Sequence, residues 1–315
     1  MELPKYFIGC DWGTTNFRLK LVDTATLKVL AEYRTDQGVK ALYEKFRLQK
    51  DVDQQGFFTE YLLKQLERFP NEHRKHIVVA SGMASSSIGL CELEYAEIPY
   101  TCSGETLNWK LMALREGQDL LVISGVKDRT GMMRGEEVQS IGLEAHFAHC
   151  QSGVLLLPGT HSKHLSFKSG QFYALKNYMT GELFELLTRK SILSNSIHSG
   201  ENKPLRKSAF EEGMHLGLKG MLTSSLLSVR AKDVVQNLDR EDNYFFLSGL
   251  LIGDELSYLR NIDEKVVLAA PESVCGLYKI VLERIVDYDK LTVLDNADLE
   301  KSLLLGQKKI LKYAK

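Results

Sequence analysis

The feature of this chain that most constrains its fold is a pattern of short strands and polar loops that occurs twice. In the first copy, two apolar runs flank the loop Asp-Trp-Gly-Thr-Thr-Asn; in the second, the loop is Gly-Thr-His-Ser-Lys-His. Strands are expected at 6–11, 17–23 and 28–34, and again at 153–158, 165–168 and 171–177. Hairpins with polar turns are common and the copies share little sequence identity. Repetition of both the pattern and the loop chemistry nevertheless predicts two similarly folded lobes.

The rest of the chain alternates between helical and strand periodicity. Helices are expected at 57–69, 135–150, 209–229, 245–259, 273–285 and 298–313, and further strands at 76–80, 120–123, 265–270 and 291–294. This alternation predicts an α/β fold. The spacing Gly213-x-x-x-Gly217 indicates a close approach of two helices.

Composition excludes several classes of protein. The 315 residues include 40 Lys and Arg against 41 Asp and Glu, so the basic excess of a nucleic-acid-binding protein is absent. No apolar run approaches the length of a membrane span, and the N-terminus does not read as a signal peptide. The five cysteines are scattered without a Cys-x-x-Cys spacing, which is typical of a reduced cytoplasmic protein. Oligomeric state is not readable from the sequence, so a homodimer stays open.

The first loop offers the groups that bind phosphate and a divalent cation. Gly13 permits a tight turn or a close approach to a ligand. Backbone N–H groups and the hydroxyls of Thr14 and Thr15 can donate to phosphate oxygens. Asp11, at the end of its strand, can hold Mg²⁺, usually through water. The alternative is an ordinary hairpin loop.

The second loop provides the same chemistry. It contains a flexible Gly159, the hydroxyls of Thr160 and Ser162, and the cation of Lys163. Two such loops facing each other across a cleft would grip a polyphosphate from both sides. We therefore expect the Asp11 and Gly159 loops to converge on one triphosphate.

The motifs also carry a family resemblance. DWGTTNFR resembles the first phosphate loop of the actin and hexokinase superfamily of ATPases. The fuller set resembles the 2-dehydro-3-deoxygalactonokinases, nearly from end to end: MMRGEEVQSIG (132–142), LPGTHSKH (157–164), MTGELFELL (179–187) and FLSGLLIGDE (246–255). The resemblance implies a cytoplasmic transferase of galactonate catabolism. Such a kinase uses ATP and Mg²⁺ to phosphorylate the 6-hydroxyl of a small sugar acid, 2-dehydro-3-deoxy-D-galactonate.

The resemblance further implies a two-lobed α/β fold of the actin-like ATPase (ribonuclease H-like) type, with an interlobe cleft. The first lobe would span 1–135 and hold the sugar acid and the first phosphate loop. The second, 136–296, would hold the second phosphate loop and adenosine, with the helix at 135–150 crossing between the lobes. The closing helix, 297–315, would return toward the first lobe. Closure of the lobes would expel water.

Nucleotide-binding roles follow from the same resemblance. Gly13, Thr14 and Thr15 match the first phosphate loop, and Gly159, Thr160 and Ser162 match the second. Gly249, Gly253 and Ala270 fall where the superfamily holds adenosine. The corner at 269–273 departs from the usual glycine-rich pattern, because Pro271 removes a donor and flexibility.

The resemblance to carbohydrate kinases also implies an acid about two dozen residues before the second phosphate loop, at the start of a helix, as the base that accepts the proton of the sugar hydroxyl. Glu136 is our choice, because a helix N-terminus favours its ionised form. Asp128 and Glu137 are rivals, and a pair of helix-capping acids is the alternative.

Substrate contacts are expected from the first lobe. Arg134 could bind the sugar-acid carboxylate bidentately, although an arginine at a helix start is more often in an ion pair. The loop at 81–89 offers N–H and hydroxyl groups for a polyol, and its alternative reading is a flexible connection. The contacts expected from the loop are Ser81, Gly82, Met83 and Ser86, and Trp109 is a weaker candidate for the substrate wall.

Other functions stay open. A phosphohydrolase or ATPase of the same fold, or a non-catalytic sugar-acid sensor, would share these loops. The sequence does not separate the galactonate from the gluconate stereochemical series. Three histidine pairs spaced three residues apart lack a visible third and fourth metal ligand: His73/His76, His146/His149 and His161/His164.

Overall fold

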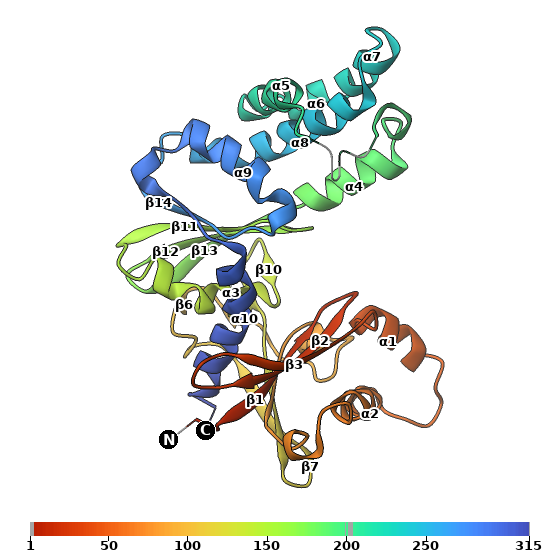
Figure 1. Cartoon of the computed structure of the whole chain (residues 1–315), viewed down its shortest axis with the longest axis vertical. Helices are drawn as coiled ribbons and strands as arrows, with labels where there is room; N and C mark the ends of the chain where they lie inside the picture. Colours follow the sequence, from red (N-terminus) through yellow and green to blue (C-terminus); the bar gives the residue numbers. More distant parts are fainter. Residues whose placement is uncertain (1–2, 199, 201–203, 315) are drawn as a thin grey trace. The chain divides into compact units, whose positions relative to one another are not determined.

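The computed structural model describes residues 3–198, 200 and 204–314. The chain divides into two compact units, which are considered separately (Figure 1). Unit 1 comprises Met1–Gln151, Ser166–Leu175 and Ala297–Lys315, and unit 2 comprises Ser152–Leu165 and Lys176–Asn296. Within the described residues, no helix is both long enough and apolar enough to cross a membrane.

Unit 1 is built on a six-stranded sheet in the order β3-β2-β1-β4-β8-β7. The first three strands are antiparallel neighbours, β4 and β8 are added in parallel beside β1, and β7 is antiparallel to β8. The strands are β1 (Tyr6–Trp12), β2 (Phe17–Asp23), β3 (Val29–Thr35), β4 (Val78–Gly82), β7 (Trp109–Arg115) and β8 (Gln118–Ile123). The predicted opening three strands are confirmed, and β7 was not predicted.

The other elements of unit 1 are short strands and helices. A three-stranded sheet has the order β10-β9-β5. The strands of this sheet are β5 (Ala96–Glu97), β9 (Val126–Lys127) and β10 (Met132–Met133). A further short strand, β6 (Tyr100–Thr101), pairs with β13 instead. The helices are α1 (Val39–Phe46), α2 (Gln54–Leu66), α3 (Glu136–Gly142) and α10 (Asn296–Leu311), with 3-10 turns η1 (Asn71–His73), η2 (Met83–Ser85) and η3 (Glu144–His146). Helix α2 begins three residues before its predicted start, because the Asp53 side chain accepts the Gly56 N–H and caps the helix.

The closing helix α10 packs directly against β1 and α3 in unit 1 (Figure 1). A Cβ on Gly9 would stand 2.5 Å from Gln307 Oε1. A Cβ on Gly142 would stand 1.8 Å from the Ser302 carbonyl oxygen, and one on Gly306 1.9 Å from that of Val138. These backbone contacts correct the predicted boundary at residue 135: residues 136–151 group with unit 1, and the predicted long helix at 135–150 is only one short helix and a 3-10 turn.

Unit 2 repeats the strand arrangement of unit 1. Its strands lie in a six-stranded sheet with the order β15-β14-β11-β12-β13-β6, in which β14 is parallel to both of its neighbours. As in unit 1, three strands consecutive in the chain lie together and later strands are added in parallel beside the first, so the predicted duplication and the actin-like α/β class are confirmed. The strands are β11 (Ser152–Leu157), β12 (Ser162–Lys168), β13 (Gln171–Tyr178), β14 (Lys265–Leu268) and β15 (Leu291–Val293). Residues 166–175 of β12 and β13 group with unit 1, where β13 pairs with β6.

The helices of unit 2 pack on this sheet through one apolar core that joins β11 and β14 to α5, α8 and α9. The helices are α4 (Thr180–Lys190), α5 (Lys207–Leu218), α6 (Leu222–Ser225), α7 (Ser228–Val234), α8 (Arg240–Leu256) and α9 (Glu272–Ile285), with 3-10 turns η4 (Ser194–Ser196), η5 (Ser257–Leu259) and η6 (Tyr288–Lys290). The single helix predicted at 209–229 is instead three helices. Gly220, with φ of 71°, lets the chain turn after α5.

Glycines let α5 and α8 approach each other closely. A Cβ on Gly213 would stand 2.0 Å from the Phe246 carbonyl oxygen, and one on Gly217 2.2 Å from that of Leu250. From the other side, a Cβ on Gly249 would stand 2.1 Å from the Phe210 carbonyl oxygen, and Gly253 faces Met214 in the same way. The close approach predicted from the Gly213 and Gly217 spacing is confirmed.

Candidate functional site

The first loop of unit 1 is held against the start of α1. The Gly38 N–H donates to the Thr15 carbonyl oxygen at 3.1 Å, and the Val39 N–H donates to that of Gly13 at 3.0 Å. A Cβ on Gly38 would stand 2.3 Å from the Thr14 carbonyl oxygen, so only glycine fits there. Thr14 and Thr15 remain exposed. The loop is therefore anchored through its backbone carbonyls while its two hydroxyl side chains face outward.

Asp11 lies at the end of β1, opposite Arg18 of β2 and Ser81 of β4. Burial raises the pKa of its carboxyl group; the positive charges of Arg18 and Lys20 lower the pKa, and the negative charge of Glu136 raises it again. This electrostatic coupling brings the predicted magnesium ligand and the predicted base into one cluster within unit 1.

Two glycines with left-handed backbones form part of the same cluster. Gly82 has φ of 79°, and a Cβ there would stand 2.9 Å from the Trp12 carbonyl oxygen and 3.8 Å from Asp11 Oδ1. Gly135 has φ of 108°, and its Cβ would stand 3.6 Å from Gly82 Cα. The chain thus passes without side chains beside Asp11 and enters α3 at Glu136.

The three candidate bases differ in how their carboxylates are bound. Glu137 is fully buried, and the Gly135 N–H donates to both of its oxygens at 2.8 Å. Burial, followed by the charge of Glu136, raises the pKa of Glu137 to about 8. Asp128 accepts the N–H groups of Thr130 and Gly131 at 2.7 Å, and hydrogen bonds of this kind lower its pKa. Both carboxyl groups therefore accept hydrogen bonds from the backbone of their own turn. Glu136 is half-buried at the first position of α3.

Arg134 binds a segment of its own unit. Its Nη1 donates to the carbonyl oxygen and to Oγ of Ser85, both at 2.6 Å, and its Nε donates to the Tyr95 hydroxyl at 2.9 Å. The guanidinium group also lies 4.0 Å from the centre of the Tyr95 ring. Arg134 therefore fixes the segment between these residues, with most of its donors already used.

The predicted substrate loop at 81–89 is a hydrogen-bonded turn. Ser81 is fully buried, and its hydroxyl oxygen accepts Gln307 Nε2–H at 3.0 Å. The Ser86 hydroxyl donates to the Met83 carbonyl oxygen at 2.8 Å. Trp109 lies on β7, paired with Ile123, and is 36% exposed. These hydrogen bonds favour a fixed turn over the alternative of a flexible connection at 81–89.

A pocket of about 310 Å³ in unit 2 contains the predicted second phosphate loop. The N-terminus of α4 is held against this loop: the Glu182 N–H donates to the Thr160 carbonyl oxygen at 3.0 Å. A helix N-terminus presents N–H groups and a positive partial charge, both of which favour phosphate. The lining residues are Pro158, Gly159, Thr160, Thr180, Gly181, Phe184, Glu185, Tyr244, Ser248, Leu251, Ile252, Pro271, Ser273, Val274, Leu277 and Tyr278.

The remainder of this pocket is mostly apolar and comes from α4, α8 and α9. Leu251, Ile252 and Leu277 provide a surface suited to a nucleobase, beside the Pro271 corner that departs from the superfamily pattern. Four of the predicted nucleotide-binding residues of unit 2 are not among the lining residues. Ser162 is fully buried behind the loop. Gly249 and Gly253 lie in the contact with α5, and Ala270 belongs to the apolar core.

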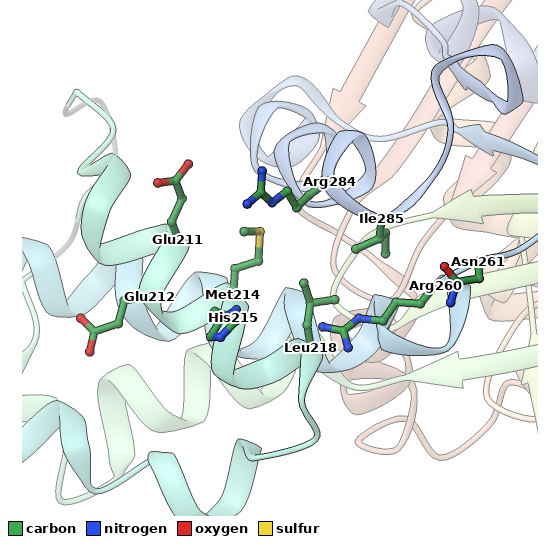
Figure 2. Close-up of a pocket in the computed structure, with 9 residues that line it drawn as sticks. All are labelled: Glu211, Glu212, Met214, His215, Leu218, Arg260, Asn261, Arg284 and Ile285. Atoms are coloured by element: carbon green, nitrogen blue, oxygen red, sulfur yellow. The ribbon is translucent and has the colours of Figure 1, made fainter.

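A second pocket in unit 2, of about 740 Å³, is lined from α5, α9 and the turn after η5 (Figure 2). Arg260 and Arg284 lie at its edge, and Met214, Leu218 and Ile285 form its apolar part. None of the predicted site residues lines it. The smaller pocket is therefore the candidate nucleotide site.

Histidines from the three predicted pairs contact protein side chains. Across the described ranges, no three or more His, Cys, Asp or Glu side chains are grouped so that they could hold a metal ion. His73 Nδ1 lies 3.1 Å from His76 Nε2, and His161 Nε2 lies 2.5 Å from a Glu182 oxygen.

Comparison with known proteins assigns the chain to a family. The sequence profile of the family described as 2-keto-3-deoxy-galactonokinase matches residues 11–299. The chain belongs to this family. It is 30% identical to the 2-dehydro-3-deoxygalactonokinase of Escherichia coli over 283 residues, which cover 87% of this chain and 88% of that protein. It is 29% identical to a probable 2-dehydro-3-deoxygalactonokinase of Rhizobium meliloti over 82% of this chain and 81% of that protein.

A solved structure from Sinorhizobium meliloti, of a protein provisionally assigned as a 2-dehydro-3-deoxygalactonokinase, has the same fold. It superposes with a TM-score of 0.81 at 25% sequence identity, covering 98% of this chain and 99% of the other. The fold and family expected from the motifs are therefore confirmed.

Sequence reasoning on this galactonokinase-family chain missed most of the apolar pocket wall. Ser248, Leu251 and Ile252 follow helical spacing on one face of α8, while the glycines at 249 and 253 lie on the face toward α5. That spacing was a signal for the pocket residues. Tyr95, which holds Arg134, had no such signal, because it lies 39 residues away in the chain.

Proposed function

We propose that this chain is an ATP-dependent kinase that transfers the γ-phosphate of ATP to the 6-hydroxyl of 2-dehydro-3-deoxy-D-galactonate. The observation that carries the proposal is the family match over residues 11–299, together with the similarly named E. coli relative. The proposal assigns the enzyme to galactonate catabolism in the cytoplasm.

On the nucleotide side, the pocket of unit 2 receives ATP. The Gly159–Thr160 loop and the first turn of α4 bind phosphate, and the apolar surface from α8 and α9 receives the adenosine. Support comes from the hydrogen bond between Glu182 N–H and the Thr160 carbonyl oxygen, which aligns helix and loop. In unit 1, the loop with exposed Thr14 and Thr15 offers phosphate-binding groups of the same kind, as the duplicated loop chemistry predicts.

On the acceptor side, Glu136 takes the proton of the 6-hydroxyl. Support comes from its half-buried position at the start of α3, where the helix dipole favours the carboxylate. Glu137 and Asp128 stay as rivals; backbone N–H groups donate to the carboxyl groups of both. Phosphoryl transfer depends mainly on positioning and charge neutralisation, so the base supplies only part of the rate enhancement.

Asp11 is the residue that would hold Mg²⁺. A carboxylate oxygen is a ligand that Mg²⁺ prefers. Burial raises the pKa of Asp11 despite the positive charges of Arg18 and Lys20, and the Glu136 charge raises it further, so a bound cation would stabilise the ionised form. When bound, Mg²⁺ supplies positive charge to the phosphate oxygens. On this proposal, Asp11→Asn weakens the use of Mg-ATP while the fold survives.

The sugar acid lies against the turn after β4 in unit 1. Arg134 contributes its positive charge toward the substrate carboxylate while its hydrogen bonds to Ser85 and Tyr95 keep it in place. The half-buried Met83 and the neighbouring backbone complete the polyol contact. Trp109 of β7 would form part of the wall of the same site.

A substrate panel tests the proposal. ADP release with Mg-ATP is followed for the 2-keto-3-deoxy acids of the galactonate and gluconate series, which form a matched stereochemical pair. We expect ADP release to depend on the sugar acid, to favour the galactonate series, and to give a phosphate ester at carbon 6 by ³¹P NMR. ADP release without any sugar acid would instead identify a hydrolase, and a preference for the gluconate series would reassign the substrate.

A further inference from the structure

A chain of buried hydrogen bonds runs from the second phosphate loop into the core of unit 2. Glu255, at the C-terminal end of α8, is 2% exposed, and one of its oxygens lies 2.8 Å from the Tyr278 hydroxyl of α9. Its other oxygen lies 2.8 Å from His164 Nε2 of β12. One buried carboxylate thus joins two helices and the strand that follows the phosphate loop.

The Tyr278 hydroxyl connects this carboxylate to the pocket. Tyr278 lines the nucleotide pocket. Its oxygen lies 3.3 Å from Ser162 Oγ, and it also hydrogen bonds with the Thr180 side chain at the start of α4. Ser162 is fully buried. Thr180, by contrast, lines the pocket itself.

The chemistry of the groups sets the direction of every hydrogen bond in this chain. A carboxylate only accepts, so the Tyr278 O–H and the His164 Nε2–H both donate to Glu255. The single proton of Tyr278 is then used, and its oxygen accepts from the hydroxyls of Ser162 and Thr180. The Ser162 proton therefore points into the wall of the pocket.

We propose that Glu255 is a positioning residue for phosphate binding, acting through Tyr278. The role of Glu255 rests on the proposed kinase function. It also changes the role of Ser162, which was predicted to bind phosphate directly. Ser162 ties the loop to the network, while backbone N–H groups of the loop and of α4 meet the phosphate. At the other end of the network, His164 Nδ1 lies 2.9 Å from the Tyr258 hydroxyl, and Lys176 lies over the Tyr258 ring.

Direct binding measurements test the proposal with a matched pair of variants. Tyr278→Phe removes the hydroxyl beside the loop, and Tyr258→Phe removes the hydroxyl at the far end of the same network. ATP and ADP binding are measured by calorimetry and adenosine binding by saturation-transfer NMR. We expect Tyr278→Phe and Glu255→Gln to weaken ATP binding about tenfold or more. Adenosine binding should change by less than about twofold, and Tyr258→Phe should change either ligand by no more than that.

Two outcomes overturn the proposal. ATP affinity that is unchanged in Tyr278→Phe would remove the link to phosphate, and equal weakening of ATP and adenosine would make the network general support for unit 2. Circular dichroism and thermal unfolding report whether each variant folds. If Tyr278→Phe does not fold, Thr180→Val replaces it, with Thr180→Ser expected to restore affinity. Because binding is read without turnover, failure of the substrate assignment leaves this test intact.

Discussion

Gly181 of α4 faces Thr160 so closely that a Cβ on the glycine would stand 2.8 Å from Thr160 Cα and 2.5 Å from the Gly159 carbonyl oxygen. Both contacts are to backbone, which cannot rotate away. Gly181→Ala must therefore displace the phosphate loop from the helix N-terminus. We expect the KM for ATP to rise about tenfold or more, a loss of about 1.4 kcal/mol of binding free energy. Steady-state kinetics with varied ATP measures it.

Gly276 of α9 provides the matched control. It also lies within a helix, and a Cβ there would meet nothing within 4 Å. Gly276→Ala should leave the KM for ATP unchanged and raise the free energy of unfolding by about 0.5–1 kcal/mol. Equal KM values for the two variants would contradict the close loop contact.

Glu136→Gln should lower kcat by about 10²–10⁴-fold, because the amide cannot accept the proton of the sugar hydroxyl. ATP binding, measured by calorimetry, should persist. Asp128→Asn is the control, since the Asp128 carboxylate is bound to its own turn through Thr130 and Gly131. Near-normal turnover in Glu136→Gln together with a large loss in Asp128→Asn would move the role of base to Asp128.

Glu137 makes the stability of unit 1 depend on pH. Its folded pKa of about 8 lies above the ordinary value of 4.5, so the folded state keeps a proton that the unfolded chain has lost between these values. The free energy of unfolding should therefore fall as pH rises through this window, at a limiting slope of about 1.4 kcal/mol per pH unit. Urea unfolding at several pH values measures this slope.

Glu137→Gln should flatten that dependence, because the glutamine does not titrate. Glu60→Gln, an exposed position on α2, serves as the control and should retain the wild-type slope. An unchanged slope in Glu137→Gln would show that the pH dependence arises elsewhere.

Gly249→Ala distinguishes helix packing from adenosine binding at that position. Its Cβ would stand 2.1 Å from the Phe210 carbonyl oxygen, so α5 and α8 would have to separate. We expect the free energy of unfolding to fall by about 1–3 kcal/mol. Adenosine affinity should change little as long as the protein is folded. Loss of adenosine affinity without loss of stability would return Gly249 to the nucleotide site.

The parts of the fold that were predictable from sequence depend on local patterns. Alternating apolar residues and short polar turns fixed the strands around the loops at Asp11 and Gly159, because the period of a strand is read within a few residues. The resemblance of the motifs to a known family then indicated that both loops bind phosphate.

The parts that were missed depend on contacts between distant segments. The placement of α3 with unit 1 follows from backbone contacts between Gly142 and Ser302, which no local pattern encodes. In the same way, the donors of Arg134 are used by Ser85 and Tyr95, 49 and 39 residues away. Glycines at 249 and 253 fit both a helix contact and a ligand contact by sequence alone, and only the position of α5 separates the two.

The contact between β1 and α10 has a consequence for biosynthesis. Gln307 donates hydrogen bonds to the Cys10 carbonyl oxygen at 3.2 Å and to the Ser81 hydroxyl at 3.0 Å. The strand that carries Asp11 is therefore completed by a residue that is translated 297 positions after Cys10. A nascent chain that still lacks α10 has synthesised all of unit 2 but cannot finish unit 1. Asp11 is thus the first of the predicted site residues to be translated, yet its strand is completed only after unit 2 has been made.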